Sequence, residues 1–299
     1  MGQLTIDQSD GELAAMSPAT VASSSGTTLF YPNGGAIHPS GHWFYVTNNQ
    51  NATVSQFTIG TAGALTSMVT STITSPSSYA SPTAVAVDPS GKYAYVASQI
   101  GNGTGQALIS QYTIEQSTGA LESNGYSLTG PSTYSTPFTI KIASIPSGEY
   151  DYVTNYQDGT IWQHKVQDDG TLASLGSVST GGTIAIEIAV HPSGKYLYAT
   201  VYTGSPSSVV AQFNIDQTDG TLSAMTPATV SAGGIGADSI AIDSSGRYAY
   251  VTSGDSGWGS TSIAQYEIDQ TTGALALMTN PTVPTSSASG PSEIVVVGK

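Results

Sequence analysis

One motif recurs five times along the chain and constrains the fold more than any other feature. Each copy is a short turn ending in Ser-Gly, and the copies lie roughly 50 residues apart, a spacing typical of sheet-based repeats. An alternating aromatic segment follows each turn, as in KYAYVA and KYLYAT, and a second segment follows that, as in SQYTI and AQFNI. Alternation with period two between Gly-containing turns predicts consecutive antiparallel strands. The turns begin at His38, Asp88, Ile145, His191 and Asp243.

A complete repeat runs from Ile188 to Met225. It holds three alternating apolar runs, IAV, YLYATV and VVAQFNI, and a weaker fourth run that begins at Leu222. Aromatic pairs such as Tyr196/Tyr198 recur in the second strand, where we expect them to pack between sheets. Because a lone four-stranded sheet leaves apolar faces uncovered, such repeats stack around an axis. The sequence therefore predicts an all-β fold, a β-propeller of four-stranded antiparallel blades, in a single domain over residues 1–299.

The two ends of the chain carry partial repeats. Residues 3–16 match the third and fourth strands, and residues 291–297 (PSEIVVV) match the first strand. We expect the C-terminal strand to join the N-terminal strands in one blade, which gives six blade units. That blade would lack its second strand, so two alternatives stay open: a seven-bladed propeller, or a fragment of a longer one.

The composition argues against several classes of protein. The chain has 6 Lys and Arg residues against 20 Asp and Glu, a net charge of −14, so it lacks the basic patches that bind nucleic acids and anionic membranes. No apolar run approaches the ~18 residues of a membrane-spanning helix. Cysteine is absent, which excludes disulfides, thiolate metal sites and cysteine nucleophiles. Abundant Ser, Thr and Gly favour an extracellular or periplasmic protein, with the targeting segment absent from this chain; a cytoplasmic location stays open.

The repeats resemble those of a known family. The segments AVDPSGKYAYVAS from Ala86, ISQYTI from Ile109 and TGAL from Thr118 are similar to repeats of the lactonase-type β-propellers, which include 6-phosphogluconolactonase-like and YncE-like members. The resemblance covers nearly the whole chain and implies a propeller, usually of seven blades, with lactone hydrolysis as one activity. Relatives that act on anionic lactones are expected to gather Arg, His and Glu at the channel mouth. This chain has one arginine, Arg247, which follows a turn on the opposite face.

The loops of one face differ from repeat to repeat, and we place the candidate site there. The turns from first to second and from third to fourth strand are stereotyped, whereas the loops from second to third strand vary in length and content. Loops that only reverse the chain can be alike, but loops that contact a ligand need different chemistry at each position. The candidate ligand-binding residues are Asn48, Asn155, Tyr156, Tyr202, Asp255 and Trp258.

Charged residues near the entry to the first strands form a second candidate set. Alignment on the turns places Glu187, Asp238, Glu293 and Lys141 at the channel mouth, with the third repeat aligned at Ile140/Lys141 or one residue away. The set could form a salt-bridged plug, a cation site or an acid/base group. Carboxylates without paired histidines favour Ca²⁺ over zinc, with Glu187 and Glu293 as its ligands; no other cofactor is expected.

The histidines do not gather into a zinc site. His38 and His191 occupy a turn position that Asp88 and Asp243 hold elsewhere, so we expect them to be turn residues. His164 lies in a third strand, away from both.

Two functional hypotheses from different classes remain. The favoured one is a non-catalytic extracellular or periplasmic scaffold with a binding face at the channel mouth, because no convincing catalytic group stands out. Its partner would be a small molecule, a carbohydrate or a protein, and its oligomeric state stays open. The alternative is a lactonase-like hydrolase acting through Glu187, Glu293, Asp238 and Lys141, which the near-absence of arginine disfavours.

Overall fold

The computed structural model describes residues 2–6, 13–22, 32–77, 80–100, 107–129, 136–204, 207–254, 262–285, 294 and 296. Within these ranges the chain consists of β-strands and one short 3₁₀ helix, η1 (Asn49–Asn51), and no helix there is long and apolar enough to cross a membrane. The chain forms two compact units, one of Met1–Thr133 with Asp168–Thr171, the other of Tyr134–Gln167 with Leu172–Lys299.

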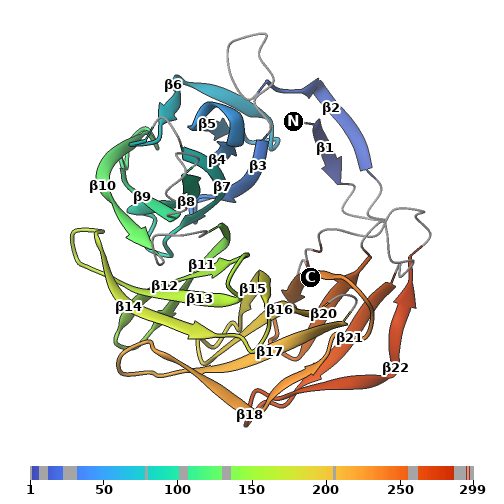
Figure 1. Ribbon diagram of the computed structural model, residues 1–299. Coiled ribbons are helices and arrows are strands. Elements are labelled where there is room, and N and C mark those ends of the chain that lie inside the picture. Colours follow the sequence, from blue (N-terminus) through green and yellow to red (C-terminus); the bar gives the residue numbers. More distant parts are fainter. Residues whose placement is uncertain are drawn as a thin grey trace. The chain divides into compact units, whose positions relative to one another are not determined.

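The first unit contains a two-stranded sheet and two four-stranded sheets, all antiparallel (Figure 1). The four-stranded sheets follow chain order, β3-β4-β5-β6 and β7-β8-β9-β10. Its strands are β1 (Gly2–Ile6), β2 (Leu13–Thr20), β3 (Pro32–Ile37), β4 (Trp43–Asn48), β5 (Thr53–Ile59), β6 (Leu65–Thr74), β7 (Ala80–Val87), β8 (Tyr93–Ile100), β9 (Ala107–Ile114) and β10 (Leu121–Thr129).

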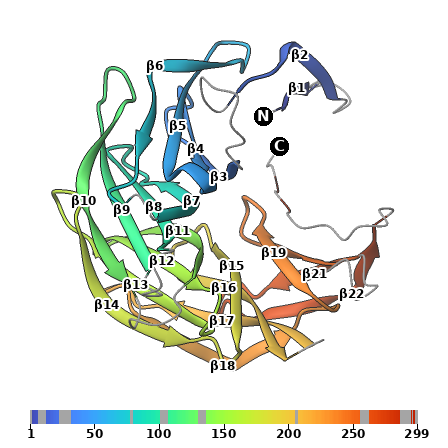
Figure 2. The same cartoon turned by 45° about the horizontal axis from the view of Figure 1, so that its top comes forward.

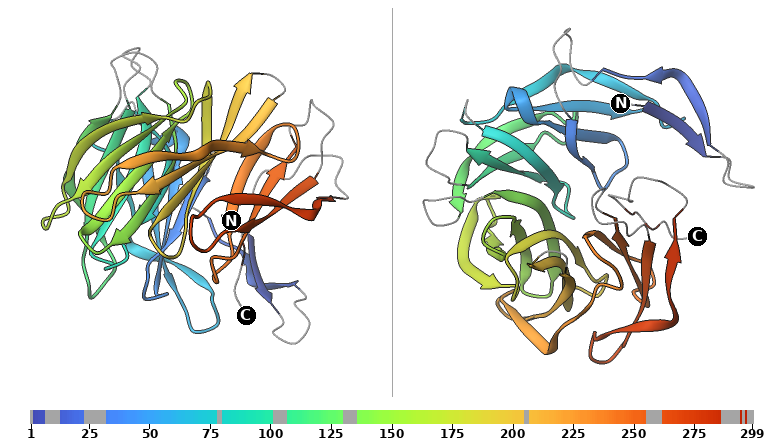
Figure 3. Two further views of the ribbon diagram at one scale, coloured as in Figure 1. Left: turned by 90° about the horizontal axis from the view of Figure 1, so that it is seen from below. Right: turned by 45° about the vertical axis from the view of Figure 1, so that its right-hand side comes forward.

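The second unit contains three four-stranded antiparallel sheets, again in chain order. The strands of each sheet are visibly twisted (Figure 3). They are β11 (Pro137–Ile145), β12 (Gly148–Asn155), β13 (Thr160–Val166), β14 (Leu172–Ser179), β15 (Ile184–Val190), β16 (Tyr196–Gly204), β17 (Ser207–Ile215), β18 (Leu222–Ser231), β19 (Ala237–Ile242), β20 (Tyr248–Ser253), β21 (Ser262–Ile268) and β22 (Leu275–Pro284). The predicted all-β fold of four-stranded antiparallel meanders is confirmed.

The second-strand tyrosines connect successive sheets, as the sequence predicts. In the second unit the Tyr152 hydroxyl donates to the Gly220 carbonyl at 2.6 Å, and the Tyr198 hydroxyl donates to the Gly273 carbonyl at 2.6 Å. Both rings are fully buried. Gly273 has a φ of +74°, and a Cβ there would lie 2.5 Å from the Tyr196 ring. Only glycine therefore fits this turn, which explains why the turn is stereotyped.

Glutamines hold the other stereotyped contacts. Gln217 Nε2 donates to the carbonyls of Gly194 at 3.0 Å and Ile215 at 2.9 Å, and so ties the two turns of one sheet together. At the N-terminus, Gln3 Oε1 accepts from the Leu65 amide at 2.6 Å. The equivalent Gln212 Oε1 accepts from the Leu275 amide at 2.7 Å. The N-terminal pair β1–β2 thus contacts its neighbouring sheet through the link that complete repeats use.

The histidines of the turns are structural, as predicted. His191 Nδ1 accepts from the Ser193 amide at 3.1 Å, and Nε2 donates to the Gly246 carbonyl of the next repeat at 2.8 Å. His38 makes the same two contacts in the first unit, with the Ser40 amide and the Gly91 carbonyl.

A pair of buried ionisable side chains lies between β12 and β13. Asp151 of β12 lies opposite His164 of β13, with 3.6 Å between Asp151 Oδ2 and His164 Nδ1. Both side chains are buried, and neither the carboxylate oxygens nor the ring nitrogens make a hydrogen bond. The matching residues of the next sheet are Leu197 and Phe213. Burial raises the pKa of Asp151 and lowers the pKa of His164 to about 4.

Candidate functional site

The first strands of the three sheets in the second unit, β11, β15 and β19, lie side by side (Figure 2). Each carries a bulge near its start, where its register against the second strand shifts. Bulges bend a strand and re-aim its side chains, and they are common next to functional sites. The candidate residues of this unit cluster at these bulges.

Buried threonine hydroxyls fix the spacing of the three strands. Thr154 Oγ1 accepts from the Thr139 amide at 3.0 Å and donates to the Ile186 carbonyl at 2.8 Å. Thr200 Oγ1 accepts from the Glu187 amide at 3.1 Å and donates to the Asp238 carbonyl at 3.2 Å. Each hydroxyl therefore joins one first strand to the next, and the backbones of Glu187 and Asp238 meet at a single oxygen atom.

Glu187 is held by two groups from β11. Lys141 Nζ lies 3.2 Å from Glu187 Oε1, and Thr139 Oγ1 donates to Glu187 Oε2 at 3.0 Å. The Lys141 side chain is 48% exposed and the Glu187 side chain 20% exposed, so solvent reaches the pair. The structure thus brings together two of the four charged residues that the sequence singled out. The arrangement can supply a fixed carboxylate and an adjacent ammonium group.

The register of β11 differs from the turn-based alignment. Ile140 lies opposite Val153, just as Ile188 lies opposite Ala199, so the equivalents of Ile186/Glu187 are Phe138/Thr139 and not Ile140/Lys141. The offset is two residues because the hairpin of the third repeat is tighter, with Ile145 paired to Gly148. Lys141 nevertheless reaches Glu187. It lies two residues after Thr139, and side chains two apart on a strand share a face.

Two aromatic residues, Phe138 of β11 and Tyr156 after β12, contact each other. The rings of Phe138 and Tyr156 have centroids 5.8 Å apart, and Phe138 is 42% exposed. The Tyr156 amide donates to the Thr136 carbonyl at 2.8 Å, which fixes the loop after β12. Tyr156 was a predicted ligand residue, whereas Phe138 was missed because the alignment was displaced. The available signal in the sequence was a phenylalanine at the start of the first strand of the third repeat.

Asp238 is paired with Tyr202. The Tyr202 hydroxyl donates to Asp238 Oδ1 at 3.0 Å, which joins β16 to β19. Both side chains are half-buried. The structure therefore brings a second predicted carboxylate and a second predicted aromatic residue into contact, one first strand away from Glu187.

The two predicted asparagines are occupied within their own sheets. Asn155 is buried, accepts from the Thr136 amide at 2.8 Å and donates to Asp158 Oδ2 at 2.7 Å. Asn48, in the first unit, is buried and donates to Thr53 Oγ1 and Ser55 Oγ. Both amides stabilise the loop between the second and third strands.

Outside the described residues lie three predicted site residues: Glu293, Asp255 and Trp258. Glu293 was one of the two expected Ca²⁺ ligands. Nearby, the Ile294 amide donates to Ser239 Oγ at 3.3 Å. Within the described ranges no group of three or more His, Asp or Glu side chains could hold a metal ion. Both Glu187 oxygens already contact Lys141 and Thr139.

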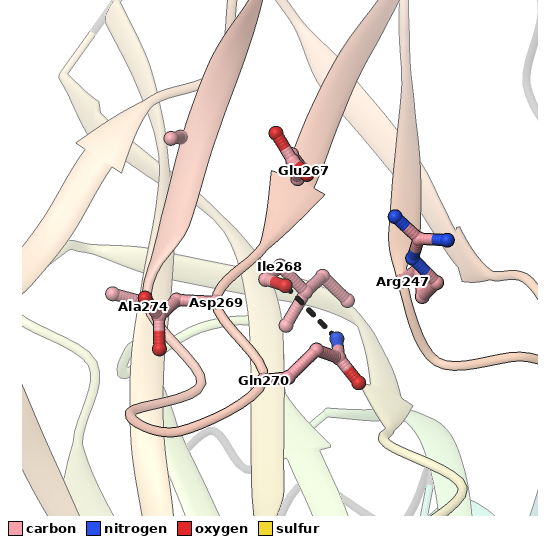
Figure 4. A pocket seen from close by; sticks show the side chains of 7 residues that line it. Arg247, Glu267, Ile268, Asp269, Gln270 and Ala274 are labelled. Carbon is pink, nitrogen blue, oxygen red and sulfur yellow. Dashed lines mark hydrogen bonds between the residues drawn. The ribbon is translucent and has the colours of Figure 1, made fainter.

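Arg247 stands at the far end of its strand. It precedes β20, whose other end carries Thr252, the acceptor of the Ser239 amide beside the site. Five residues of strand separate the two positions by roughly 16 Å. Arg247 lines a pocket with Glu267, Ile268 and Gln270, and Gln270 Nε2 donates to the Ile268 carbonyl at 2.9 Å (Figure 4).

Comparisons with known proteins agree with this architecture. The structure is similar to a putative 6-phosphogluconolactonase from Bacteroides fragilis (22% identity, 97% of this chain and 78% of that chain, TM-score 0.71) and to another from Bacteroides uniformis (20%, 94% and 77%, 0.71). It is also similar to the periplasmic gluconolactonase of Pseudomonas aeruginosa (17%, 87% and 72%, 0.68). At these identities the likeness concerns the fold.

A comparison with curated proteins found no match. The sequence itself matches the family described as "Lactonase, 7-bladed beta-propeller" over residues 3–133 and 142–289. The match covers most of both units, but residues 137–141 of β11, which include Thr139 and Lys141, lie outside it. The chain therefore belongs to the lactonase family of seven-bladed β-propellers.

Proposed function

We propose that this protein is a hydrolase that opens a lactone ring at the site formed by Lys141, Glu187 and Asp238. The observation that carries the proposal is the Glu187 carboxylate, held by Lys141 at 3.2 Å and by Thr139 at 3.0 Å while solvent still reaches it. Family membership and the lactonase-like neighbours support hydrolysis more than a non-catalytic binding protein.

In the proposed reaction Glu187 is the general base and Lys141 the electrophile. A water molecule beside Glu187 attacks the lactone carbonyl carbon, and its proton passes to the carboxylate. The Lys141 ammonium stabilises the negative charge that develops on the carbonyl oxygen. The acyl C–O bond of the ring then breaks, and the proton moves from Glu187 to the ring oxygen, which leaves as an alcohol. The product is an open-chain hydroxy acid.

Asp238 and Tyr202 orient the substrate in this scheme. The Tyr202 hydroxyl fixes one carboxylate oxygen of Asp238 at 3.0 Å. A fixed carboxylate accepts hydrogen bonds from ring hydroxyl groups, and correct orientation contributes a large share of most rate enhancements. Thr200 joins the backbones of Glu187 and Asp238, and so holds together the two strands that carry the carboxylates.

The test is the initial rate of lactone opening, followed by a pH indicator because each opening releases one proton. A panel of neutral and phosphorylated lactones is compared with the uncatalysed rate in the same buffer. Glu187→Gln should lower kcat by about 10²- to 10⁴-fold, the usual contribution of a general base. Lys141→Met should lower it by about 10²-fold or more.

The matched control is Glu267→Gln, which removes an exposed carboxylate of β21 that lines the Arg247 pocket. Its kcat should stay within about twofold of the wild-type value, since surface substitutions rarely disturb a fold. If no lactone is opened above background, or if Glu187→Gln and Glu267→Gln behave alike, the proposal fails.

A further inference from the structure

We propose that Phe138 and Tyr156 form an aromatic platform that selects an uncharged ring, a neutral sugar lactone, over the same lactone carrying a phosphate. The inference rests on the proposed function, because it names the substrate class of that site. It comes from two observations. The exposed Phe138 ring contacts Tyr156 and precedes Thr139, which binds the Glu187 carboxylate, and the local charge balance is unfavourable to anions.

The platform is positioned by β11, the strand whose Thr139 and Lys141 bind Glu187. Phe138 immediately precedes Thr139, whose hydroxyl donates to Glu187 Oε2 at 3.0 Å. The Tyr156 amide donates a hydrogen bond to the Thr136 carbonyl, and the Tyr156 ring contacts the Phe138 ring at a tilt of 32°. Phe138 is 42% exposed while it contacts Tyr156, so part of its ring is accessible to a ligand.

Such a platform suits one face of a sugar ring. The C–H groups of a pyranose-like ring are apolar on one face, while its hydroxyl groups point outward around the edge. Sites for small ligands combine aromatic walls with a few fixed polar groups. Here the wall is Phe138 and Tyr156, and the polar groups are Glu187 and the Asp238–Tyr202 pair.

The charges of the site oppose a phosphate. The one ammonium group in contact with Glu187 is that of Lys141, and Glu187 neutralises it at 3.2 Å. With Asp238 included, the three side chains Lys141, Glu187 and Asp238 carry one net negative charge. The only arginine of the chain, Arg247, lies at the opposite end of its strand, and the whole chain carries a net charge of −14. Phosphate sites use arginine forks, lysines or helix N-termini, and the described residues around Glu187 offer no such unpaired group.

The kinetic experiment compares glucono-δ-lactone with its 6-phosphate under identical conditions. The neutral lactone should have a kcat/KM at least about 10-fold higher, because a dianion is repelled by the two carboxylates. Phe138→Ala should raise KM for the neutral lactone by about 10-fold with kcat within about threefold. Phe138→Tyr keeps an aromatic face and should restore KM. Tyr126→Ala, which removes a 56% exposed ring on β10, is the control and should leave KM unchanged.

A binding measurement separates this inference from the proposed function. The probe is the δ-lactam of gluconic acid, which has the same neutral ring and resists opening, titrated by calorimetry. Binding to the wild type that weakens about 10-fold in Phe138→Ala supports the platform, even if no lactone is turned over. Equal or better turnover of the phosphorylated lactone overturns the inference. So does a KM or a lactam affinity that Phe138→Ala leaves unchanged, or a lactam that does not bind.

Discussion

Replacing the buried pair Asp151 and His164 with Leu and Phe should stabilise the protein. The pair lies between β12 and β13, both side chains are buried, and four polar atoms make no hydrogen bond. The next sheet carries Leu197 and Phe213 at the matching positions, with 0% and 1% exposure, so the backbone accommodates this apolar pair. The substitution therefore copies a solution that the chain already contains.

The magnitude follows from the unpaired groups. Each unsatisfied buried polar group costs about 1–3 kcal/mol. We expect about 3 kcal/mol for Asp151→Leu/His164→Phe, which for a chain of this size raises Tm by roughly 5 °C. Each single substitution strands one buried polar partner, so it should gain less than the double variant.

The gain should depend on pH in a defined direction. Burial raises the pKa of Asp151 and lowers the pKa of His164 from 6.5 to about 4, so the folded pair favours its neutral forms, with the proton on Asp151. Between about pH 4 and 6.5 the unfolded chain also holds one proton on the pair, on the histidine, and the two states are balanced. Above about pH 6.5 the unfolded histidine releases its proton, whereas the raised pKa of Asp151 favours a proton on the folded pair. The folded wild type therefore loses stability as pH rises through this range, and the advantage of the double variant should grow.

The assay is thermal and denaturant unfolding of the wild type, both single variants and the double variant, at several pH values. The reciprocal exchange, Leu197→Asp/Phe213→His, is the matched control and should destabilise by a comparable amount. A double variant no more stable than the wild type at pH 7 would refute the reasoning. An advantage that shrinks as pH rises above 6.5 would refute the assignment of the proton.

Three further predictions concern Thr200, His191 and metal ions. Thr200→Val leaves the Glu187 amide and the Asp238 carbonyl without their partner and should cost about 2 kcal/mol in unfolding free energy, whereas the exposed Thr203→Val should cost less than about 0.5 kcal/mol; equal losses would contradict the role of Thr200. His191→Ala removes the contacts to Ser193 and Gly246 and should cost about 1–2 kcal/mol by denaturant titration, with partial recovery in His191→Asp because Asp243 accepts from its own turn; an unchanged midpoint in His191→Ala would contradict the link. Dialysis against EDTA should leave lactone opening unchanged, because in the proposed reaction the Lys141 ammonium, and not a metal ion, stabilises the developing charge; loss of activity that Ca²⁺ restores would favour a cation site instead.

Because the sequence repeats regularly, most of the fold could be predicted from it. Turn glycines, second-strand tyrosines and turn histidines recur at fixed positions because each makes the same contact in every sheet, as Tyr152 and Tyr198 do with Gly220 and Gly273. Such contacts depend on residues within one repeat and the next. Their positions could therefore be predicted from spacing alone.

The parts that depend on register could not be predicted. Phe138 was missed because the third hairpin is two residues tighter, which moves the whole of β11 relative to its turn. A shift of two residues preserves the alternation of faces, so the apolar pattern did not reveal the shift. The Asp151–His164 contact needs the cross-strand pairing of β12 and β13. In the sequence Asp151 and His164 are single polar residues in two different strands, and nothing there shows that they pair.

The most direct test of a functional site at Glu187 is a crystal structure of the protein with the δ-lactam of gluconic acid. The account predicts the lactam ring over Phe138 and Tyr156, with its carbonyl oxygen within hydrogen-bonding distance of Lys141 Nζ. A lactam bound in the pocket of Arg247 and Glu267, with the surroundings of Glu187 empty, would contradict it.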